Sequence, residues 1–259
     1  MAFQLTAPNL EYIAIRVKDL ERLTAFYQNL PGIHLLSEEN NLAFFSSHEE
    51  QKAFLILEDT PFGLAENKKA KKLARFSLRV KDISCFRLLK EILVKKKIPF
   101  SKLVEHSTKK ALTIVDPEGN QVTFFVDEKE NTSPFLYTLG KVHLNVENRK
   151  KAAHFFNVVL GLNSTFDEGK YFKLNVEQWL GFNDEIEKLP KAEEEIEVLG
   201  LDFVTISLPN QEELKKLVEH LSTLEIAHFK DQKLTIVTLF DDNQVEWWFV
   251  DRTNRKGRH

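Results

Sequence analysis

Three arginines and a tyrosine provide the first set of residues that could do chemistry in this chain. Arg16, Arg75 and Arg79 are expected to share a strand face with Tyr12 in the first half of the sequence. Guanidinium groups bind planar carboxylates and tetrahedral phosphates through paired N–H donors. The pattern therefore predicts a site for a small anionic ligand. In the alternative interpretation these arginines pair with acidic side chains on neighbouring strands or reach solvent.

The second half of the sequence offers a different set, in which polar groups alternate with aromatic rings. On the same expected face are Lys141, His143, Asn145, Phe203, Thr205, Ser207, Gln244, Glu246 and Trp248. Thr123 and Phe125 take the corresponding places late in the first half. A concave surface of this mixed character would be the default binding site of a globular protein.

Strand alternation assigns these residues to one face. In the first strand, Ile13, Ile15 and Val17 point to one side, and Tyr12 and Arg16 point to the other, because successive side chains alternate. The apolar side must lie under helices. The opposite side is then the helix-free side, where a ligand could reach the polar and aromatic groups.

The elements that position these residues occur in a repeated pattern. Tyr12 aligns with Lys141, Phe26 with Phe155, and Gly32 with Gly161, without a gap. Each quarter of the chain has the pattern of a strand, a helix and three short strands. Asp19 and Asp82 are expected to cap the first two helices, and residues 116–120 form a turn. Repetition of this length indicates duplicated domains.

The repeat also predicts the domain boundaries. We expect an N-terminal pair of modules at residues 1–128, a linker at 129–138, a C-terminal pair at 139–251 and a basic tail at 252–259. The acid-rich segment 185–197 is expected to be an exposed loop between the third and fourth quarters.

Composition excludes several classes of protein. The 259 residues are 42% hydrophobic and carry a net charge of -3, so nothing favours a nucleic acid or an anionic membrane as partner. The single cysteine, Cys85, rules out an internal disulfide and a cysteine-rich zinc site. No secretion signal or membrane span is expected, which predicts a cytoplasmic protein.

Several sequence motifs resemble the vicinal oxygen chelate superfamily, which includes glyoxalases, bleomycin-resistance proteins and extradiol dioxygenases. They are Leu-Glu-Tyr-Ile-Ala-Ile-Arg-Val-Lys-Asp-Leu at residues 10–20, Ala-Phe-Tyr at 25–27, Gly-Ile at 32–33 and Asp-Pro-Glu-Gly-Asn-Gln-Val at 116–122. Residues 35–45 and 69–75 look most like the CppA family. The resemblance implies an α+β fold of four tandem βαβββ modules, with each pair forming a curved mixed β-sheet cup and the helices outside.

The resemblance also implies where a metal would bind. In the superfamily, ligands come from a histidine on the opening strand of each module in a pair and a glutamate on a closing strand. The matching positions here hold Tyr12, Arg75 and Thr123 in one set and Lys141, Phe203 and Glu246 in the other. A metal ligand needs a lone pair, which an ammonium group and a phenyl ring lack. We therefore expect a degenerate metal site and no cofactor.

Two interpretations of Glu246 remain open. Lys141 could occupy the place of the metal and pair with Glu246 across the cup. Alternatively, His143 and Glu246 could hold Fe, Mn, Zn or Ni in a shifted register, although a stable site normally needs three or four protein ligands.

The functional prediction is a small-molecule binder or interaction module, existing as a monomer or homodimer. The alternative is a metal-dependent dioxygenase or lyase that uses the C-terminal cup. A second alternative is a proteinase, because CppA proteins carry the name of a complement-degrading proteinase. The sequence gives that last class little support, since it lacks His-Glu-x-x-His and Gly-x-Ser-x-Gly and offers Cys85 no activating base.

Overall fold

A computed structural model describes residues 3–47, 52–64, 71–103, 109–127, 136–166, 171–185 and 197–253. The expected linker and basic tail, and the acid-rich segment, fall mostly outside these residues. The first module contains β1 (Asn9–Val17), α1 (Leu20–Gln28), β2 (His34–Glu39), β3 (Leu42–Ser46) and β4 (Leu55–Asp59). The second contains β5 (Leu73–Val80), α2 (Ile83–Lys95), β6 (Ser101–Leu103), β7 (Lys109–Val115) and β8 (Gln121–Asp127).

The second half of the chain repeats this order. The third module contains β9 (Tyr137–Val146), α3 (Arg149–His154), the π-helix η1 (Phe155–Val159), β10 (Ser164–Phe166), β11 (Tyr171–Lys173) and β12 (Trp179–Glu185). The fourth contains β13 (Gly200–Leu208), α4 (Gln211–Thr223), β14 (Phe229–Lys230), β15 (Ile236–Phe240) and β16 (Glu246–Asp251). This is the α+β arrangement that the sequence predicts.

Local signals in the sequence set the helix starts. The side chain of Asp19 accepts a hydrogen bond from the backbone N–H of Arg22, and Asp82 accepts one from Cys85, as expected for N-caps. Asn148 and Asn210 cap α3 and α4 in the same way. Each cap satisfies a backbone donor that has no partner inside the helix.

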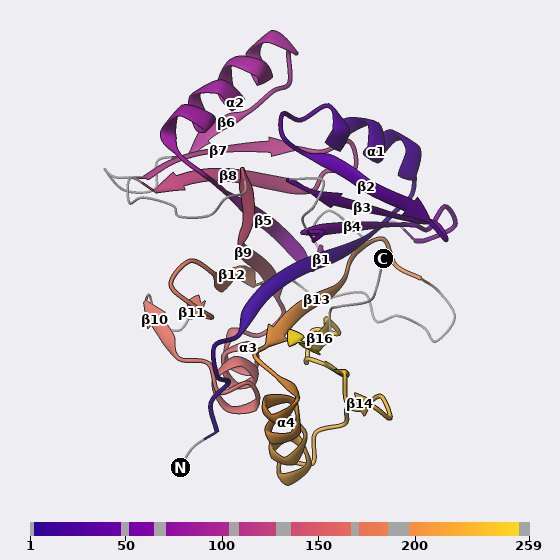
Figure 1. Cartoon of the computed structure of the whole chain (residues 1–259), viewed down its shortest axis with the longest axis vertical. Coiled ribbons are helices and arrows are strands. Elements are labelled where there is room, and N and C mark those ends of the chain that lie inside the picture. Colours follow the sequence, from indigo (N-terminus) through magenta and orange to yellow (C-terminus); the bar gives the residue numbers. More distant parts are fainter. Residues whose placement is uncertain are drawn as a thin grey trace.

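The strands form two eight-stranded mixed sheets, each of which joins one module from each half of the chain. The first sheet has the order β14-β15-β16-β13-β1-β4-β3-β2, and the second has β10-β11-β12-β9-β5-β8-β7-β6. At their centres, β1 pairs antiparallel with β13, and β5 pairs antiparallel with β9. In Figure 1 each sheet consequently runs from the end of the molecule with α1 and α2 to the end with α3 and α4.

This pairing corrects one expectation from the sequence, namely that modules adjacent in the chain share a sheet. The first module pairs with the fourth and the second with the third. Pairing between the opening strands is nonlocal, so the periodicity of each module carries no information about which partner it selects. The correction matters for function because it decides which polar residues meet.

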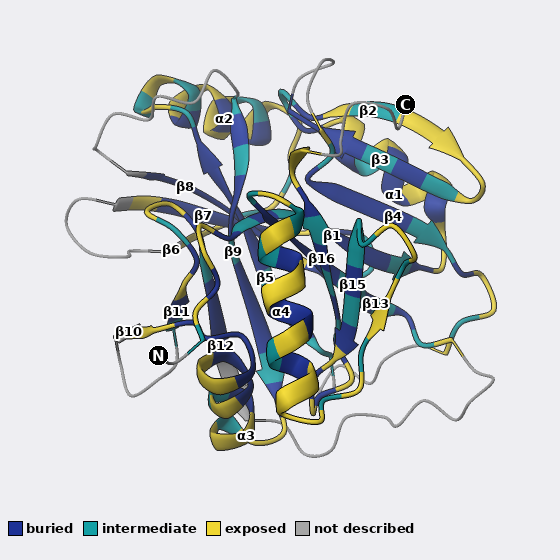
Figure 2. Ribbon diagram, turned by 60° about the horizontal axis from the view of Figure 1, so that its bottom comes forward, coloured by how far each residue is buried: buried dark blue, intermediate teal, exposed yellow. Residues whose placement is uncertain are grey.

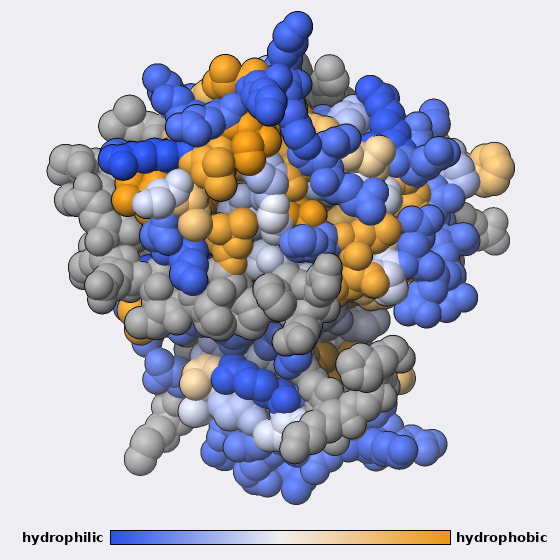
Figure 3. Space-filling model, turned by 45° about the horizontal axis from the view of Figure 1, so that its top comes forward, coloured by the Kyte–Doolittle hydropathy of each residue, from blue (hydrophilic) through white to orange (hydrophobic). Residues whose placement is uncertain are grey.

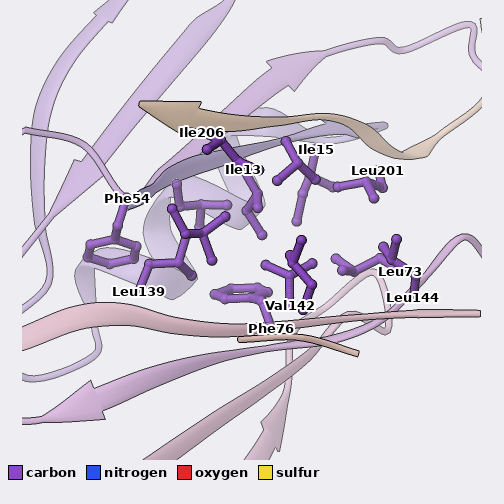
Figure 4. Close-up of a cluster of buried hydrophobic side chains, with 14 of the residues drawn as sticks. Ile13, Ile15, Phe54, Leu73, Phe76, Leu139, Val142, Leu144, Leu201 and Ile206 are labelled. Atoms are coloured by element: carbon purple, nitrogen blue, oxygen red, sulfur yellow. The ribbon is translucent and has the colours of Figure 1, made fainter. Parts of the chain in front are cut away.

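The core lies between the two sheets and under the helices. Ile13 and Ile15 of β1 face Phe76 of β5 and Val142 of β9 across this layer, and all four side chains are buried (Figure 4). Figure 2 shows the central strands buried, while the helices expose their outer sides. Tyr27 of α1 packs against Phe45 of β3, with ring centroids 5.5 Å apart, so the helix covers this same face of the sheet.

The surface at the α1 and α2 end mixes hydrophilic side chains with apolar areas, as Figure 3 shows. Leu88 and Val94 of α2 are two of the exposed apolar residues. The polar side chains selected from the sequence lie elsewhere, on the sheet faces that the helices leave uncovered.

Candidate functional site

The helix-free face of the β5–β9 sheet carries several cationic groups, and we call the set Arg75, Lys141 and His143 the basic face. Antiparallel pairing places Arg75 opposite His143 and Ser77 opposite Lys141. Parallel pairing with β8 places Thr123 beside Ser77. These neighbours come from three strands of two modules but occupy adjacent positions in the sheet, which fixes their spacing.

His143 is the most buried member of the basic face, with 1% of its surface exposed. The Nε of Arg75 donates a hydrogen bond to its Nδ1 at 3.0 Å. Because Nδ1 accepts, the neutral ring carries its proton on Nε2. Burial, together with the positive charges of Arg75 and Lys141, lowers the pKa of His143 to about 3. The imidazole is therefore a neutral hydrogen-bond donor at physiological pH.

The Nε2 donor of His143 is buried and has no hydrogen-bond partner among the described residues. The ring of Tyr171 meets His143 edge-on, with centroids 5.7 Å apart, and Gly181 allows this packing, since a Cβ there would lie 3.0 Å from Tyr171 Cδ1. A buried donor beside two cations is suited to an anionic or strongly accepting group.

Lys141 is held in place by an aromatic ring. Its Nζ lies 5.2 Å from the ring centroid of Phe125 in β8. Gly140, the residue before it, allows this ring to approach, since a Cβ there would lie 2.7 Å from Phe125 Cε1. A second such pair joins β11 and β12 of the same sheet, where Lys173 Nζ is 5.6 Å from the ring of Trp179.

Two residues that the sequence assigned to a ligand site have partners within the protein. Arg79 is buried and forms a salt bridge with Glu177. The hydroxyl of Thr123 shares a 2.8 Å hydrogen bond with Thr113 in the buried part of the sheet. For Arg79 the observed pairing agrees with the alternative interpretation, in which the arginines meet acidic neighbours.

The helix-free face of the β1–β13 sheet has a different chemistry, starting with three aromatic rings. The rings of Phe203 and Trp248 stack with centroids 4.2 Å apart and an interplanar angle of 11°. Tyr12 meets Phe203 edge-on at 6.1 Å. Thr205 lies opposite Tyr12 and beside Trp248 and is fully buried. Its Oγ1 has no hydrogen-bond partner among the described residues.

Next to these rings is a group of charged residues, Arg16, Glu58, Asp202 and Glu246, which we call the acidic face. Arg16 Nη2 lies 2.8 Å from Asp202 Oδ1, and its Nε lies 3.4 Å from Glu58 Oε2. Burial raises the pKa of the Asp202 carboxyl to about 7; Arg16 opposes this rise, while the charges of Glu58 and Glu246 add to it. Two carboxyl groups therefore contact the guanidinium of Arg16, and the charge of a third, Glu246, acts on Asp202.

Sequence reasoning missed Asp202 and Glu58. Strict alternation places Asp202 on the helix side, but the β1–β13 register shifts between Ala14 and Ile15, which leaves Asp202 as an extra residue in β13. This bulge brings it to Arg16. Glu58 lies beside Arg16 in the parallel strand β4.

The sheet pairing separates residues that the sequence had grouped. Lys141 and Glu246 lie in different sheets, so neither the expected ion pair nor a shared metal site of His143 and Glu246 is formed. Likewise, Arg16 and Tyr12 lie on one sheet, whereas Arg75 and Arg79 lie on the other. Both groupings assumed that consecutive modules form one cup.

Neither face provides the ligands that the resemblance would require for a metal. The first sheet brings together Tyr12, Phe203 and Glu246, with the Phe203 ring stacked on Trp248. The second brings together Arg75, Lys141 and Thr123. Among the described residues, no group of three or more His, Cys, Asp or Glu side chains is placed to hold a metal ion. The donor set at these positions does not fit a divalent metal.

Comparisons with known proteins agree with this fold. Residues 11–133 match the family described as CppA N-terminal. A catechol-2,3-dioxygenase of Bacillus subtilis is 23% identical over 250 residues, which cover 80% of this chain and 85% of that protein. The crystal structure of CppA from Streptococcus pneumoniae TIGR4 superposes with a TM-score of 0.61 at 17% identity, covering 97% and 100% of the two chains. Glyoxalase I from Zea mays superposes with a TM-score of 0.62 at 16% identity, covering 95% and 93%.

In the described part of the chain, no helix has the length and apolar character that crossing a bilayer requires.

The sequence resemblance itself is confirmed by the family match at residues 11–133 together with the two sheets of βαβββ modules. Residues 11–133 therefore match the CppA N-terminal family, and the chain has the fold of CppA and of glyoxalase I.

Proposed function

We propose that this protein binds a small anionic molecule on its basic face and has no metal at the superfamily position. The observation that carries the proposal is the Nε2 donor of His143, which is buried without a partner beside Arg75 and Lys141. A carboxylate or phosphate oxygen would accept from it and be stabilised by the two neighbouring charges.

The geometry supports an anion over a metal for a specific reason. The hydrogen bond from Arg75 uses the lone pair on Nδ1 of the imidazole, and Nε2 carries the proton, so the neutral ring offers no lone pair to a metal ion. The positive charges of Arg75 and Lys141 would also repel a metal ion. An anion meets neither obstacle. We propose that the superfamily's metal centre is degenerate here and that ligand recognition by charge remains.

The proposal is tested by titrating inorganic phosphate and a small dicarboxylate into the full-length protein by calorimetry. We expect His143→Phe and Arg75→Gln to weaken binding by about tenfold or more, the scale of a lost charge-assisted hydrogen bond. Arg87→Gln removes an equal charge from the exposed side of α2 and should leave binding unchanged. Equal losses in all three variants, or no saturable binding by the wild type, would contradict the proposal.

A metal-dependent dioxygenase or lyase is the second candidate, favoured by the relative named catechol-2,3-dioxygenase. It would have to use ligands other than the pair His143 and Glu246, which lie in different sheets. Elemental analysis after reloading with Fe(II), Mn(II), Zn(II) or Ni(II), in wild type and Glu246→Gln, separates the candidates. A stoichiometric metal lost in the variant would favour the enzyme.

The proteinase suggested by the CppA name has less support in the geometry. Burial raises the pKa of the Cys85 thiol, and the neighbouring Asp82 carboxylate raises it further. A nucleophilic cysteine needs the opposite shift, toward the thiolate. The thiol therefore offers no activated nucleophile for peptide hydrolysis.

A further inference from the structure

The acidic face has a chemistry opposite to that of the basic face. It carries three carboxyl groups, those of Glu58, Asp202 and Glu246, and one guanidinium, that of Arg16. The charged groups that act on Asp202 are Arg16 from β1, Glu58 from β4 and Glu246 from β16. With all three carboxyl groups ionised, the set keeps a net negative charge.

A second observation at this place is independent of the charges. Thr205 is fully buried, with 0% of its surface exposed to solvent. Its Oγ1 has no hydrogen-bond partner among the described residues. It lies on the same face, opposite Tyr12 and beside Trp248. A buried hydroxyl without a partner is costly, which indicates that a further polar group completes the site.

The aromatic rings decide which kind of cation fits. Tyr12, Phe203 and Trp248 form a contiguous aromatic wall, in which Phe203 is stacked on Trp248 and met edge-on by Tyr12. Phe203 lies directly beside Glu246 in the sheet register. Aromatic faces next to carboxylates attract ammonium groups, which gain from the ring quadrupole and from the charge together. A bare metal ion would gain little from such a wall.

Arg16 shows how a cation is held at this place. Its guanidinium bridges Glu58 and Asp202, which leaves Glu246 as the carboxylate closest in the register to the aromatic wall. We propose that the acidic face is a second binding site, which takes a small organic cation, a protonated amine or a quaternary ammonium, between Glu246 and the rings of Phe203 and Trp248. The two sheets would then present binding faces of opposite charge preference.

Binding of a cation here should be linked to pH. Asp202 holds its proton more tightly than an ordinary aspartate because it is buried beside two other carboxyl groups. A cation favours the ionised form, so its affinity should increase as the pH rises through about 7, where Asp202 loses its proton. Proton release should accompany binding on the acidic side of that range.

The test uses the full-length protein, with tetramethylammonium chloride and methylammonium chloride as probes and sodium chloride at equal ionic strength as reference. Binding is followed by calorimetry and by tryptophan fluorescence. We expect saturable binding of at least one probe, weakened about fivefold or more in Glu246→Gln and in Trp248→Leu. Asp242→Asn makes the matched charge change at an exposed position in the turn before β16 and should have no effect.

Thermal unfolding of each variant shows whether a loss of binding reflects a loss of folding. Trp248→Phe gives a second check, because it keeps an aromatic ring and should retain most of the affinity. Absence of saturable binding for both probes would overturn the proposal, as would equal binding of sodium or an equal loss in Asp242→Asn. Binding of phosphate to the basic face is measured separately, so the two proposals can fail independently.

Discussion

Arg75 donates a hydrogen bond from Nε to Nδ1 of His143 at 3.0 Å, and this contact sets the tautomer of the imidazole, which burial keeps neutral. The two residues come from β5 and β9, in different halves of the chain, and lie opposite each other in the sheet. A guanidinium cannot lose its proton under ordinary conditions, so it always donates and His143 always accepts. The histidine is thereby kept as a neutral donor through Nε2.

The first prediction follows from this state. Because the pKa of His143 in the folded protein is lowered to about 3, its ring should stay neutral where an ordinary histidine titrates. The unfolded state takes up a proton near pH 6.5, so the stability contributed by neutral His143 is complete above that pH and is lost as pH falls. Nitrogen-edited NMR of the imidazoles should show one ring that does not titrate between about pH 5 and pH 8.

We expect Arg75→Gln to raise the pKa of His143 by removing one of the charges that lower it. If the ring of His143 gains a proton between about pH 8 and pH 5 in the wild type, its pKa is not lowered in the folded protein.

A second prediction concerns Gly140, where the structure leaves no room for a side chain. A Cβ at this position would lie 2.7 Å from Phe125 Cε1 and 2.8 Å from its Cζ. Gly140→Ala should therefore destabilise the protein by about 1–3 kcal/mol, the usual cost of overpacking a rigid site. It should also displace the ring that contacts Lys141 and so weaken anion binding.

The double variant Gly140→Ala/Phe125→Leu is the control for this clash. A leucine is shorter than the ring and can yield, so the double variant should lose less stability than the sum of the single changes. Urea unfolding of the four proteins measures the coupling. Additive losses would mean that the clash is relieved in another way.

The third prediction concerns the salt bridge between Arg79 and Glu177. Arg79 is buried, whereas Glu177 is 43% exposed on its side chain, so solvent screens part of the attraction. Glu177→Ala should cost about 1–2 kcal/mol of unfolding free energy, mainly because the buried guanidinium loses its acceptor. Glu91→Ala, at an exposed position of α2, is the matched control and should cost little. Equal effects of the two changes would show that Arg79 is satisfied by other groups.

The local parts of this fold were predictable from sequence, and the nonlocal parts were not. Asp19 and Asp82 cap helices as expected because capping involves residues three positions apart. Asp116 accepts from the backbone N–H groups of Glu118 and Asn120, as the expected turn requires. The pairing of β1 with β13 depends on contacts between distant segments, which the alternation of side chains along one strand does not predict.

The candidate site shows the same division. Alternation put Arg75 and His143 on one face, and the two residues lie opposite each other in the sheet, although a register shift separates Arg75 from Leu73. It failed at Asp202, which a bulge re-aims toward Arg16. A single inserted residue reverses the side on which a side chain lies, and no periodic pattern reports it.

The fourth prediction uses the turn before β16. Asp241 is buried and accepts hydrogen bonds from the backbone N–H groups of Asn243 and Val245 and from Trp247 Nε1. Burial raises its pKa to about 6. A carboxyl whose pKa is raised in the folded state favours folding below its ordinary pKa, and this contribution is lost as pH rises toward 6.

Asp241→Asn removes the titration. The difference in unfolding free energy between wild type and variant should therefore shift in favour of the variant by about 1–3 kcal/mol between roughly pH 4 and pH 7. Asp242→Asn, one residue later and exposed, should show no such change. A difference that does not vary with pH would mean that Asp241 has an ordinary pKa in the folded protein.

The last prediction tests the sheet topology directly. A fragment of residues 1–128 contains β1 and β5 but neither of their antiparallel partners, β13 and β9. Both strands would expose unpaired backbone groups along their whole length, which favours association with other chains. We expect this fragment to dimerise or aggregate, and to recover a monomeric, cooperatively unfolding complex when mixed with residues 129–259. Light scattering after size exclusion measures both. A fragment that is monomeric and unfolds cooperatively by itself would show that the halves are independent domains, and would restore the view that consecutive modules form one unit.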